Sequence, residues 1–289
     1  CYIKRLFFME HYLDNAATTA VCRESAEIAL RVMTEDYGNP GSTHKKGRDA
    51  KKILDNARCQ VAAALGCEPK EVYFCSCGSE ADNWAIIRGA ELKKHRGKHV
   101  ISSTAEHDAV RKSLDYLEGQ GFEVTRLSPG KAGNITAQQV INALREDTVL
   151  ISLMMVNNET GAVTDIAGIA AELKKAGYKG LIHTDAVQGF LKVPFAAKKL
   201  GVDMITVSGH KIHAPKGIAA LYIRDGVKLK PYILGGGQEN YIRAGTEALP
   251  QIAAFGEACK TGKTNLKDNI SKMTDLQERI LAELTEKVP

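Results

Sequence analysis

Hydrophobic positions follow two alternating patterns along this chain. In one, apolar residues recur with the period of an amphipathic helix; in the other, valine, isoleucine and leucine form short unbroken runs of strand length. The helical stretches are residues 24–35, 47–65, 79–95, 109–119, 137–145 and 166–176, and the strand-length runs are residues 72–74, 99–102, 123–127, 149–153, 181–184, 204–207 and 218–223. Because these runs are rich in valine, isoleucine and leucine and do not alternate, we expect strands that are covered on both faces.

The order of these stretches predicts the architecture. Strands that alternate with helices are typical of an α/β fold with a mostly parallel sheet, here a seven-stranded sheet flanked by helices. The end of the chain differs, since residues 250–288 are amphipathic and helical and no strand follows them. We therefore expect an N-terminal extension (1–11), a large domain (12–249) and a helical connector (250–289) toward a further domain, which makes the chain a fragment.

Composition narrows the classes of function. Of 289 residues, 44% are hydrophobic and 25% are charged, as in an ordinary globular protein. The net charge of +5 is small and the basic residues are spread out, so we expect no nucleic-acid partner. No apolar run is long enough to span a membrane. Seven scattered cysteines, an odd number, indicate a reducing compartment such as the cytoplasm, and no histidine spacing indicates a metal site.

Two residues at strand ends indicate a particular cofactor. Asp185 directly follows the run 181–184, and a carboxylate there is costly unless a cation pairs with it. The pyridinium nitrogen of pyridoxal phosphate is such a cation, although for Asp185 taken alone an aspartate that caps the next helix is the simpler explanation. Lys211 follows the next run, 204–207, where lost hydration makes an amine nucleophilic. Either residue alone is weak evidence, but the two together are what a single cofactor, pyridoxal phosphate, requires.

Other polar groups also follow strands. Gly78 and Ser79 open a helix after the run 72–74, which provides free N–H groups for an anion, although Ser79 and Asp82 also resemble a capping pair. Ser208 and His210, beside Lys211, are further candidates for holding phosphate oxygens. His107 follows the run 99–102 and could stack on a flat ring or move protons. Asn158 follows the run 149–153 and could bind a phenolic oxygen or a carboxylate, or simply form a turn before Gly161.

Read in series, these segments resemble the cysteine desulfurases, which belong to the class V aminotransferase group of fold-type I pyridoxal-phosphate enzymes. The match runs from about residue 12 to the end of the chain. The matching motifs are Tyr12-Leu-Asp-Asn-Ala-Ala-Thr-Thr19, Gly38-Asn-Pro-Gly-Ser42, residues 75–83, Thr104-Ala-Glu-His107, Val156-Asn-Asn-Glu159, His183-Thr-Asp-Ala186, Ser208-Gly-His-Lys211, Pro215-Lys-Gly217, Gly235-Gly-Gly-Gln238 and Arg243-Ala-Gly-Thr246.

The resemblance implies a role for each matching residue. Lys211 would be the catalytic lysine that forms a Schiff base with pyridoxal 5'-phosphate, and His107 the catalytic residue that stacks on the ring. The other cofactor contacts would be Asp185 to the ring nitrogen, Gln188 to the ring hydroxyl, Gly78, Ser79, Ser208 and His210 to the phosphate, and Asn158 to cofactor or substrate. Thr246 would reach the phosphate of a neighbouring subunit, which implies a homodimer.

The implied reaction converts L-cysteine to L-alanine and passes sulfur to an enzyme persulfide, then to a sulfur acceptor or an iron–sulfur scaffold protein. The family carries its persulfide cysteine and a carboxylate-binding arginine well after the lysine, in a small C-terminal domain. No cysteine follows Cys259, so we expect both to be missing. The chain alone is then expected to bind the cofactor but to turn over little L-cysteine. Asn240 and Tyr241 also depart from the family pattern.

Three alternatives compete with this reading. A selenocysteine lyase or another class V aminotransferase would share almost all of the cofactor residues. A non-catalytic scaffold for sulfur assembly would need neither Lys211 nor Asp185, so the presence of both disfavours it. A nicotinamide-dependent dehydrogenase is disfavoured because no G-x-G-x-x-G motif follows the first strand.

Overall fold

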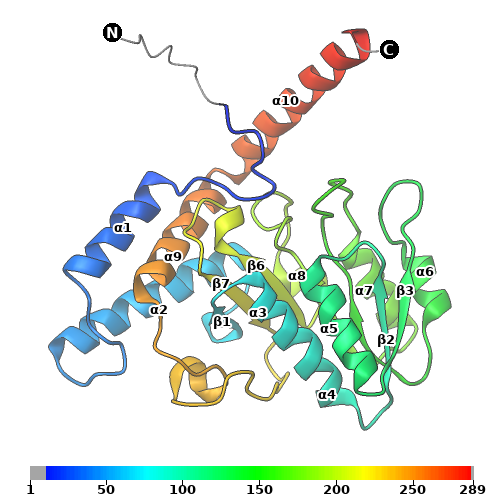
Figure 1. Cartoon of the computed structure of the whole chain (residues 1–289), viewed down its shortest axis with the longest axis horizontal. Helices are drawn as coiled ribbons and strands as arrows, with labels where there is room; N and C mark the ends of the chain where they lie inside the picture. The colour runs from blue at the N-terminus through cyan, green and yellow to red at the C-terminus, as the bar shows by residue number, and fades with distance from the viewer. Residues whose placement is uncertain (1–10, 288–289) are drawn as a thin grey trace, which may run out of the picture.

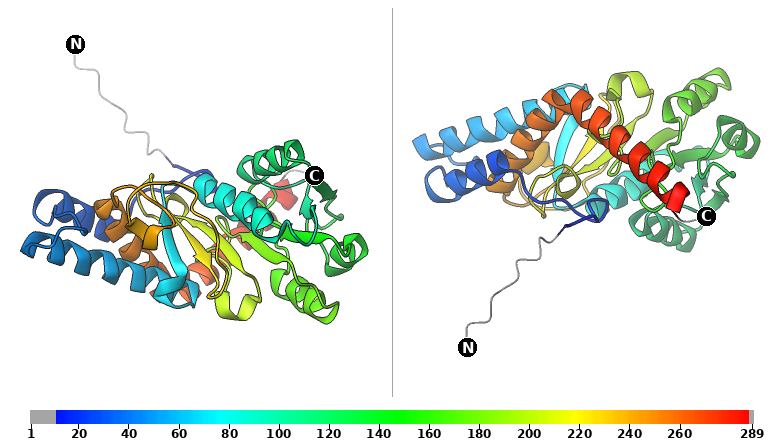
Figure 2. Two further views of the ribbon diagram at one scale, coloured as in Figure 1. Left: turned by 90° about the horizontal axis from the view of Figure 1, so that it is seen from below. Right: turned by 90° about the horizontal axis from the view of Figure 1, so that it is seen from above.

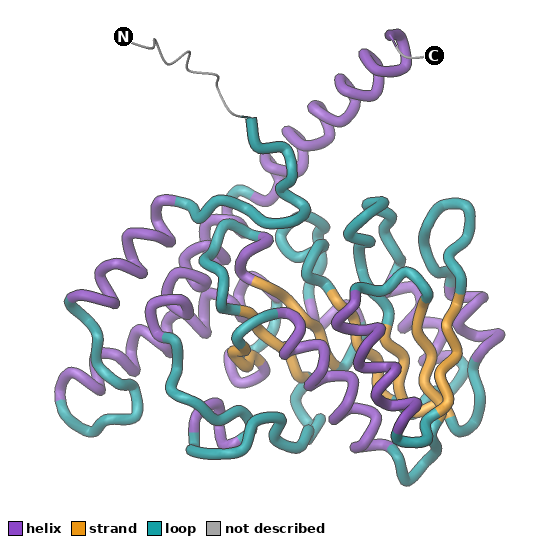
Figure 3. The backbone as a smooth tube through the Cα atoms, viewed as in Figure 1, coloured by secondary structure: helices purple, strands orange, loops and turns teal. Residues whose placement is uncertain are grey.

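Seven strands form one twisted sheet in the computed structural model, which describes residues 11–287 (Figures 1 and 3). The strands are β1 (Val72–Cys75), β2 (His99–Ser103), β3 (Glu123–Leu127), β4 (Thr148–Ser152), β5 (Leu181–Asp185), β6 (Met204–Ser208) and β7 (Ala219–Ile223). Their order across the sheet is β1-β7-β6-β5-β4-β2-β3. Neighbours from β6 to β3 are parallel, and β7 runs antiparallel to both β1 and β6. The predicted α/β fold with a mostly parallel seven-stranded sheet is therefore confirmed.

Helices connect most of these strands. They are α1 (Arg23–Thr34), α2 (Lys45–Leu65), α3 (Gly78–Asn83), α4 (Gly89–Lys93), α5 (Asp108–Gly119), α6 (Ala137–Ala143), α7 (Ile166–Lys175), α8 (Ala197–Leu200), α9 (Leu249–Thr264) and α10 (Leu266–Lys287). A π-helical turn, Trp84–Arg88, joins α3 to α4, so the helix predicted over residues 79–95 is one stretch with a wide turn inside it. The short helix α8 was not predicted from the sequence.

Both faces of the sheet are covered, as the apolar strand runs predicted. On β2, Val100 packs into a core with α3, α4 and α5, whereas its neighbour Ile101 packs into a core with α2, α6, α7 and α9. The same division separates Phe74 from Cys75 on β1. Figure 2 shows helices on both sides of the sheet. Strand β3 is less buried than the others because it lies at the edge.

The last two helices differ in their packing. Helix α9 lies against α1 and α2 and buries Ile252, Phe255 and Cys259 in the core. Helix α10 has no buried residue and extends away from the sheet (Figure 1). Between residues 11 and 287, no helix has both the length and the apolar character needed to cross a membrane. The expected extension over residues 1–11 falls almost wholly outside the described residues, as do the last two residues of the expected connector.

Candidate active site

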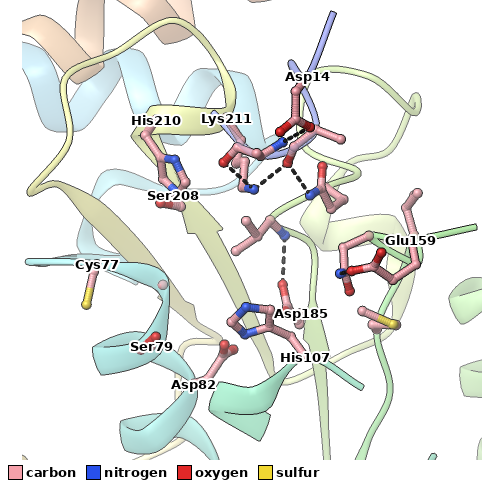
Figure 4. A pocket seen from close by; sticks show the side chains of 18 residues that line it. Asp14, Cys77, Ser79, Asp82, His107, Glu159, Asp185, Ser208, His210 and Lys211 are labelled. Carbon is pink, nitrogen blue, oxygen red and sulfur yellow. Dashed lines mark hydrogen bonds between the residues drawn. The ribbon is translucent and has the colours of Figure 1, made fainter. Parts of the chain in front are cut away.

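A cavity of about 510 Å³ lies at the carboxyl ends of the parallel strands. This is the edge where open α/β sheets bind their ligands. Its walls include all but one of the cofactor residues predicted from the sequence: Gly78, Ser79, His107, Asn158, Asp185, Gln188, Ser208, His210 and Lys211. Figure 4 shows how the labelled side chains among them surround the space. Thr246 is exposed on the segment before α9 and does not line this cavity.

Asp185, the last residue of β5, is a buried acid in the cavity wall. Its Oδ1 accepts a hydrogen bond from the backbone N–H of Val187 at 2.8 Å, so it forms a turn and does not cap a helix. Burial raises the pKa of this carboxyl, while that N–H and the nearby His107 and Lys211 oppose the rise. A cationic ring nitrogen in the cavity would therefore supply the charge partner that this carboxylate lacks. The donor set fits a pyridoxal-phosphate ring.

Lys211 reaches the cavity from the turn that follows β6. Its Nζ donates hydrogen bonds to the backbone oxygens of Ala16 and Ala17, the second at 2.8 Å. Burial lowers the pKa of the amine, and the charges of Asp14 and Asp185 oppose that effect. A half-buried amine of lowered basicity is suited to nucleophilic attack on a carbonyl.

The segment from Asp14 to Ala17 is a part of the site that sequence reasoning missed. Besides Lys211, it binds Gln188, whose Nε2 donates to Ala16 O at 2.9 Å. The chain then continues along the turn after β6, where the N–H of Thr19 donates to His210 O at 2.9 Å. The Tyr12–Thr19 motif was a signal in the sequence, but nothing local in it showed that backbone carbonyls would face a lysine almost two hundred residues away.

Gly78 and Ser79 form the first turn of α3 beside the cavity. The helix is preceded by Cys77 at its N-cap, with no side-chain cap, so the alternative in which Ser79 caps the helix is wrong. The preceding loop is held by Glu80, which accepts the N–H of Ser76 at 2.8 Å and pairs with both nitrogens of Arg243 at 2.7 and 3.0 Å. The helix N-terminus therefore keeps free N–H groups at a fixed position, as an anion such as phosphate requires.

Ser208 and His210 bring the turn after β6 to the same cavity. Ser208 is buried, and Nδ1 of His210 lies 3.2 Å from the hydroxyl of Thr18. Burial lowers the pKa of His210, and three nearby lysines lower it further. A hydroxyl and a neutral imidazole can both bind phosphate oxygens, so this side of the cavity complements the first turn of α3.

His107 and Asn158 enter from two loops that are joined to each other. Nδ1 of His107 accepts the N–H of Ala109 at 3.2 Å, so the residue also caps α5. Asn157, not Asn158, forms the turn: its Oδ1 accepts two backbone N–H groups, while its Nδ2 donates to Ala105 O at 2.9 Å. Asn158 is thereby left to line the cavity. Both predicted residues lie where they can contact a bound ring.

Buried acids surround Asp185, and the sequence did not reveal them. Glu106 accepts the hydroxyl of Ser103 at 2.7 Å and the N–H of Met154 at 3.1 Å through one oxygen, while the other has no partner. Burial raises the pKa of Glu106 to about 8. Asp82 also has an unpartnered oxygen, and burial together with the charge of Asp185 raises its pKa.

A buried histidine lies beside these acids. Nδ1 of His183 lies 2.9 Å from Ser152 Oγ and Nε2 lies 3.1 Å from Thr206 Oγ1, with Asp82 Oδ1 at 3.6 Å. Burial lowers the pKa of His183 to about 3, so the ring is neutral. Within residues 11–287, no group of three acidic, histidine or cysteine side chains is arranged to hold a metal ion.

A buried carboxyl group, a half-buried amine and a helix N-terminus around one cavity define a site of the pyridoxal-phosphate class. Comparison with known proteins supports this assignment to a class of site. The family model for class V aminotransferases matches residues 11–288. The cysteine desulfurase IscS of Methanosarcina thermophila is 43% identical over 278 residues, which are 96% of this chain and 68% of that protein.

Solved structures show the same likeness. A NifS-like protein superposes with a TM-score of 0.93 at 36% identity, covering 96% of this chain and 76% of that one. SspA in complex with cysteine gives a TM-score of 0.83 at 38% identity, over 87% of this chain and 72% of that one. The chain therefore belongs to the cysteine desulfurases of the class V aminotransferase family, whose members depend on pyridoxal phosphate.

Proposed function

We propose that this chain binds pyridoxal phosphate and takes part in moving the sulfur of L-cysteine to a cysteine thiolate, which becomes a persulfide while the substrate becomes L-alanine. The convergence of Asp185 and Lys211 on one cavity carries the proposal, because a carboxylate for a ring nitrogen and a nucleophilic amine are needed together only for this cofactor. The relatives' name and the cysteine bound to SspA support this choice of substrate.

Each cavity residue then has a part. Asp185 would hold a proton on the ring nitrogen, Gln188 and Asn158 would orient the ring hydroxyl and the substrate, and His107 would stack on the ring. Gly78, Ser79, Ser208 and His210 would bind the phosphate. The cofactor would supply an electron sink that weakens bonds to the substrate Cα. Lys211 would be the amine that holds the cofactor, and its neutral Nζ could accept the Cα proton.

Partners follow from the same reading. We propose a homodimer in which Thr246 binds the phosphate in the other subunit, which its exposure and its absence from the cavity walls of its own chain support. We also propose a sulfur acceptor or iron–sulfur scaffold protein as the recipient of sulfur. A cytoplasmic location is supported by the six cysteines of the described residues, all of which are free thiols.

An absorbance spectrum tests the cofactor and its lysine. The purified chain mixed with pyridoxal phosphate is expected to gain a visible band that Lys211→Ala abolishes, whereas the matched surface variant Lys228→Ala keeps it. Addition of L-cysteine should change the band, and addition of L-serine, which lacks the sulfur, should change it much less. A chain that stays colourless with added cofactor, or a band that survives in Lys211→Ala, would contradict the proposal.

A further inference from the structure

A second lysine lies close to the active-site lysine. Lys192, on the turn that follows β5, is half-buried, and its Nζ lies 3.4 Å from Oε1 of Gln188. The other end of the same amide donates to Ala16 O at 2.9 Å, and that oxygen also accepts a hydrogen bond from Lys211 Nζ. One glutamine side chain and one carbonyl oxygen therefore connect the two amines.

Both amines also face a shared open space. A second cavity, of about 840 Å³, adjoins the cofactor cavity and has Lys192, Lys211 and Gln188 in its walls. Ala16 and Asn158 line both cavities. Because the two lysines border one space, their charges act on each other without a layer of packed side chains between them.

The charges of the two amines oppose each other. Burial lowers the pKa of Lys192 to about 8, and the charge of Lys211 adds to this effect. Lys192 loses its proton near pH 8, so below that pH, where both side chains are ammonium ions, its charge also disfavours the charged form of Lys211. The surrounding charged and titratable groups are Asp14 and Asp185 facing Lys211, Glu159, His213 and Lys272 around the second cavity, and His210 and Lys216 after β6.

The hydrogen bonds leave Lys192 without a carboxylate. Among the described residues, its Nζ has Gln188 Oε1 as its polar partner, and that amide oxygen does not neutralise the charge. The Nζ of Lys211 is likewise bound by two uncharged carbonyls. A lysine kept near another cationic group is one known way to activate an amine, and here that effect works against the charges of Asp14 and Asp185.

We propose that Lys192 is a positioning residue for Lys211: its ammonium, held against Gln188, favours the neutral and nucleophilic form of the Lys211 amine. The inference rests on the proposed function, because it assigns Lys192 a part in loading the cofactor onto Lys211. It acts through charge and through the Gln188 side chain, so arginine at position 192 should preserve it and methionine should remove it.

The rate at which the chain without cofactor gains the visible band after addition of pyridoxal phosphate tests the proposal. At neutral pH, where Lys192 is charged, the rate is expected to fall about three- to tenfold in Lys192→Met, since a nearby charge changes the fraction of neutral amine by this order. Above about pH 8, where Lys192 is neutral, the two rates should converge. Lys192→Arg should behave as the wild type, and so should Lys272→Met, which removes another amine from the same cavity.

A second measurement does not require the cofactor. The rate of acetylation at Lys211, read by peptide mass spectrometry on the folded apo chain, should fall by the same factor in Lys192→Met at neutral pH and match the wild type above about pH 8. Equal rates in wild type and Lys192→Met at neutral pH, or a loss in Lys192→Arg as large as in Lys192→Met, would overturn the proposal. A wild-type chain that never gains the band would overturn the proposed function instead, and the acetylation profile would still decide whether the two lysines interact.

Discussion

Removal of the Arg58 side chain should destabilise the segment before α9 more than any surface ion pair could. Arg58 binds both carboxylate oxygens of Glu239 at 2.7 and 2.8 Å and also donates to Val72 O at 2.6 Å. Glu239 has a side chain only 3% exposed, and its remaining partner is the N–H of Phe74 at 3.0 Å. Arg58→Met therefore leaves a nearly buried carboxylate with one hydrogen bond.

The expected cost is about 3–5 kcal/mol of unfolding free energy, the usual result of removing one member of a buried ion pair. Backbone strain adds to the dependence on this pair, because Glu239, Asn240 and Tyr241 all have positive φ angles. Each such non-glycine residue costs about 1–2 kcal/mol, so the segment keeps its shape only while the ion pair holds it.

Urea unfolding of wild type, Arg58→Met and the double variant Arg58→Met/Glu239→Met measures this directly. The double variant leaves no unpaired charge and should recover most of the loss. Cofactor affinity should fall in Arg58→Met as well, because the same segment carries Arg243, which holds Glu80 beside the first turn of α3. A loss below about 1 kcal/mol in Arg58→Met, or a double variant less stable than the single one, would refute the reasoning.

Substitutions at Glu106 and Tyr241 should also change the stability of the protein. Burial raises the pKa of Glu106 from 4.5 to about 8, so its contribution to stability is complete below pH 4.5 and is lost as the pH rises to 8. In Glu106→Gln, the fall in unfolding free energy between pH 5 and pH 8 should be smaller than in wild type by on the order of 3 kcal/mol, as measured by urea unfolding at the two pH values. An equal fall in the two proteins would contradict this. Tyr241 is 78% exposed and has a φ of 67°, a conformation that favours glycine. Tyr241→Gly should therefore raise the free energy of unfolding by about 0.5–1 kcal/mol in thermal unfolding, whereas Tyr241→Ala should leave it unchanged.

The sheet and most helices could be predicted because their signals are local. The unbroken apolar runs identified all seven strands, and the amphipathic period identified six helical stretches within a few residues of their bounds. The wide turn at Trp84–Arg88 could not be foreseen, because its sequence continues the helical pattern without a break. The short helix α8 has too few residues to show a period.

The site was predictable where one rule sufficed. Parallel strands end at the same edge, so residues that follow different strands, such as Asp185 and Lys211, had to lie near one another. This rule could not predict that the carbonyls of Ala16 and Ala17 lie in the site, because they are backbone atoms in a segment that belongs to no strand. Lys192 could not be predicted as a site residue either, because a lysine in a turn is ordinarily solvated. Only the fold shows its partial burial and its contact with Gln188.

The distribution of charge in the site explains why so many buried acids are tolerated. Asp82 and Glu106 each keep an oxygen without a partner, and a neutral carboxyl group tolerates such burial far better than a carboxylate. Asp185 differs from both because the charges of His107 and Lys211 attract its carboxylate, so the negative charge of the site is most favoured there. The ammonium of Lys192 supplies positive charge in the wall of the second cavity. A cofactor with a cationic ring nitrogen matches the first region, and a substrate that enters with a carboxylate is drawn to the second.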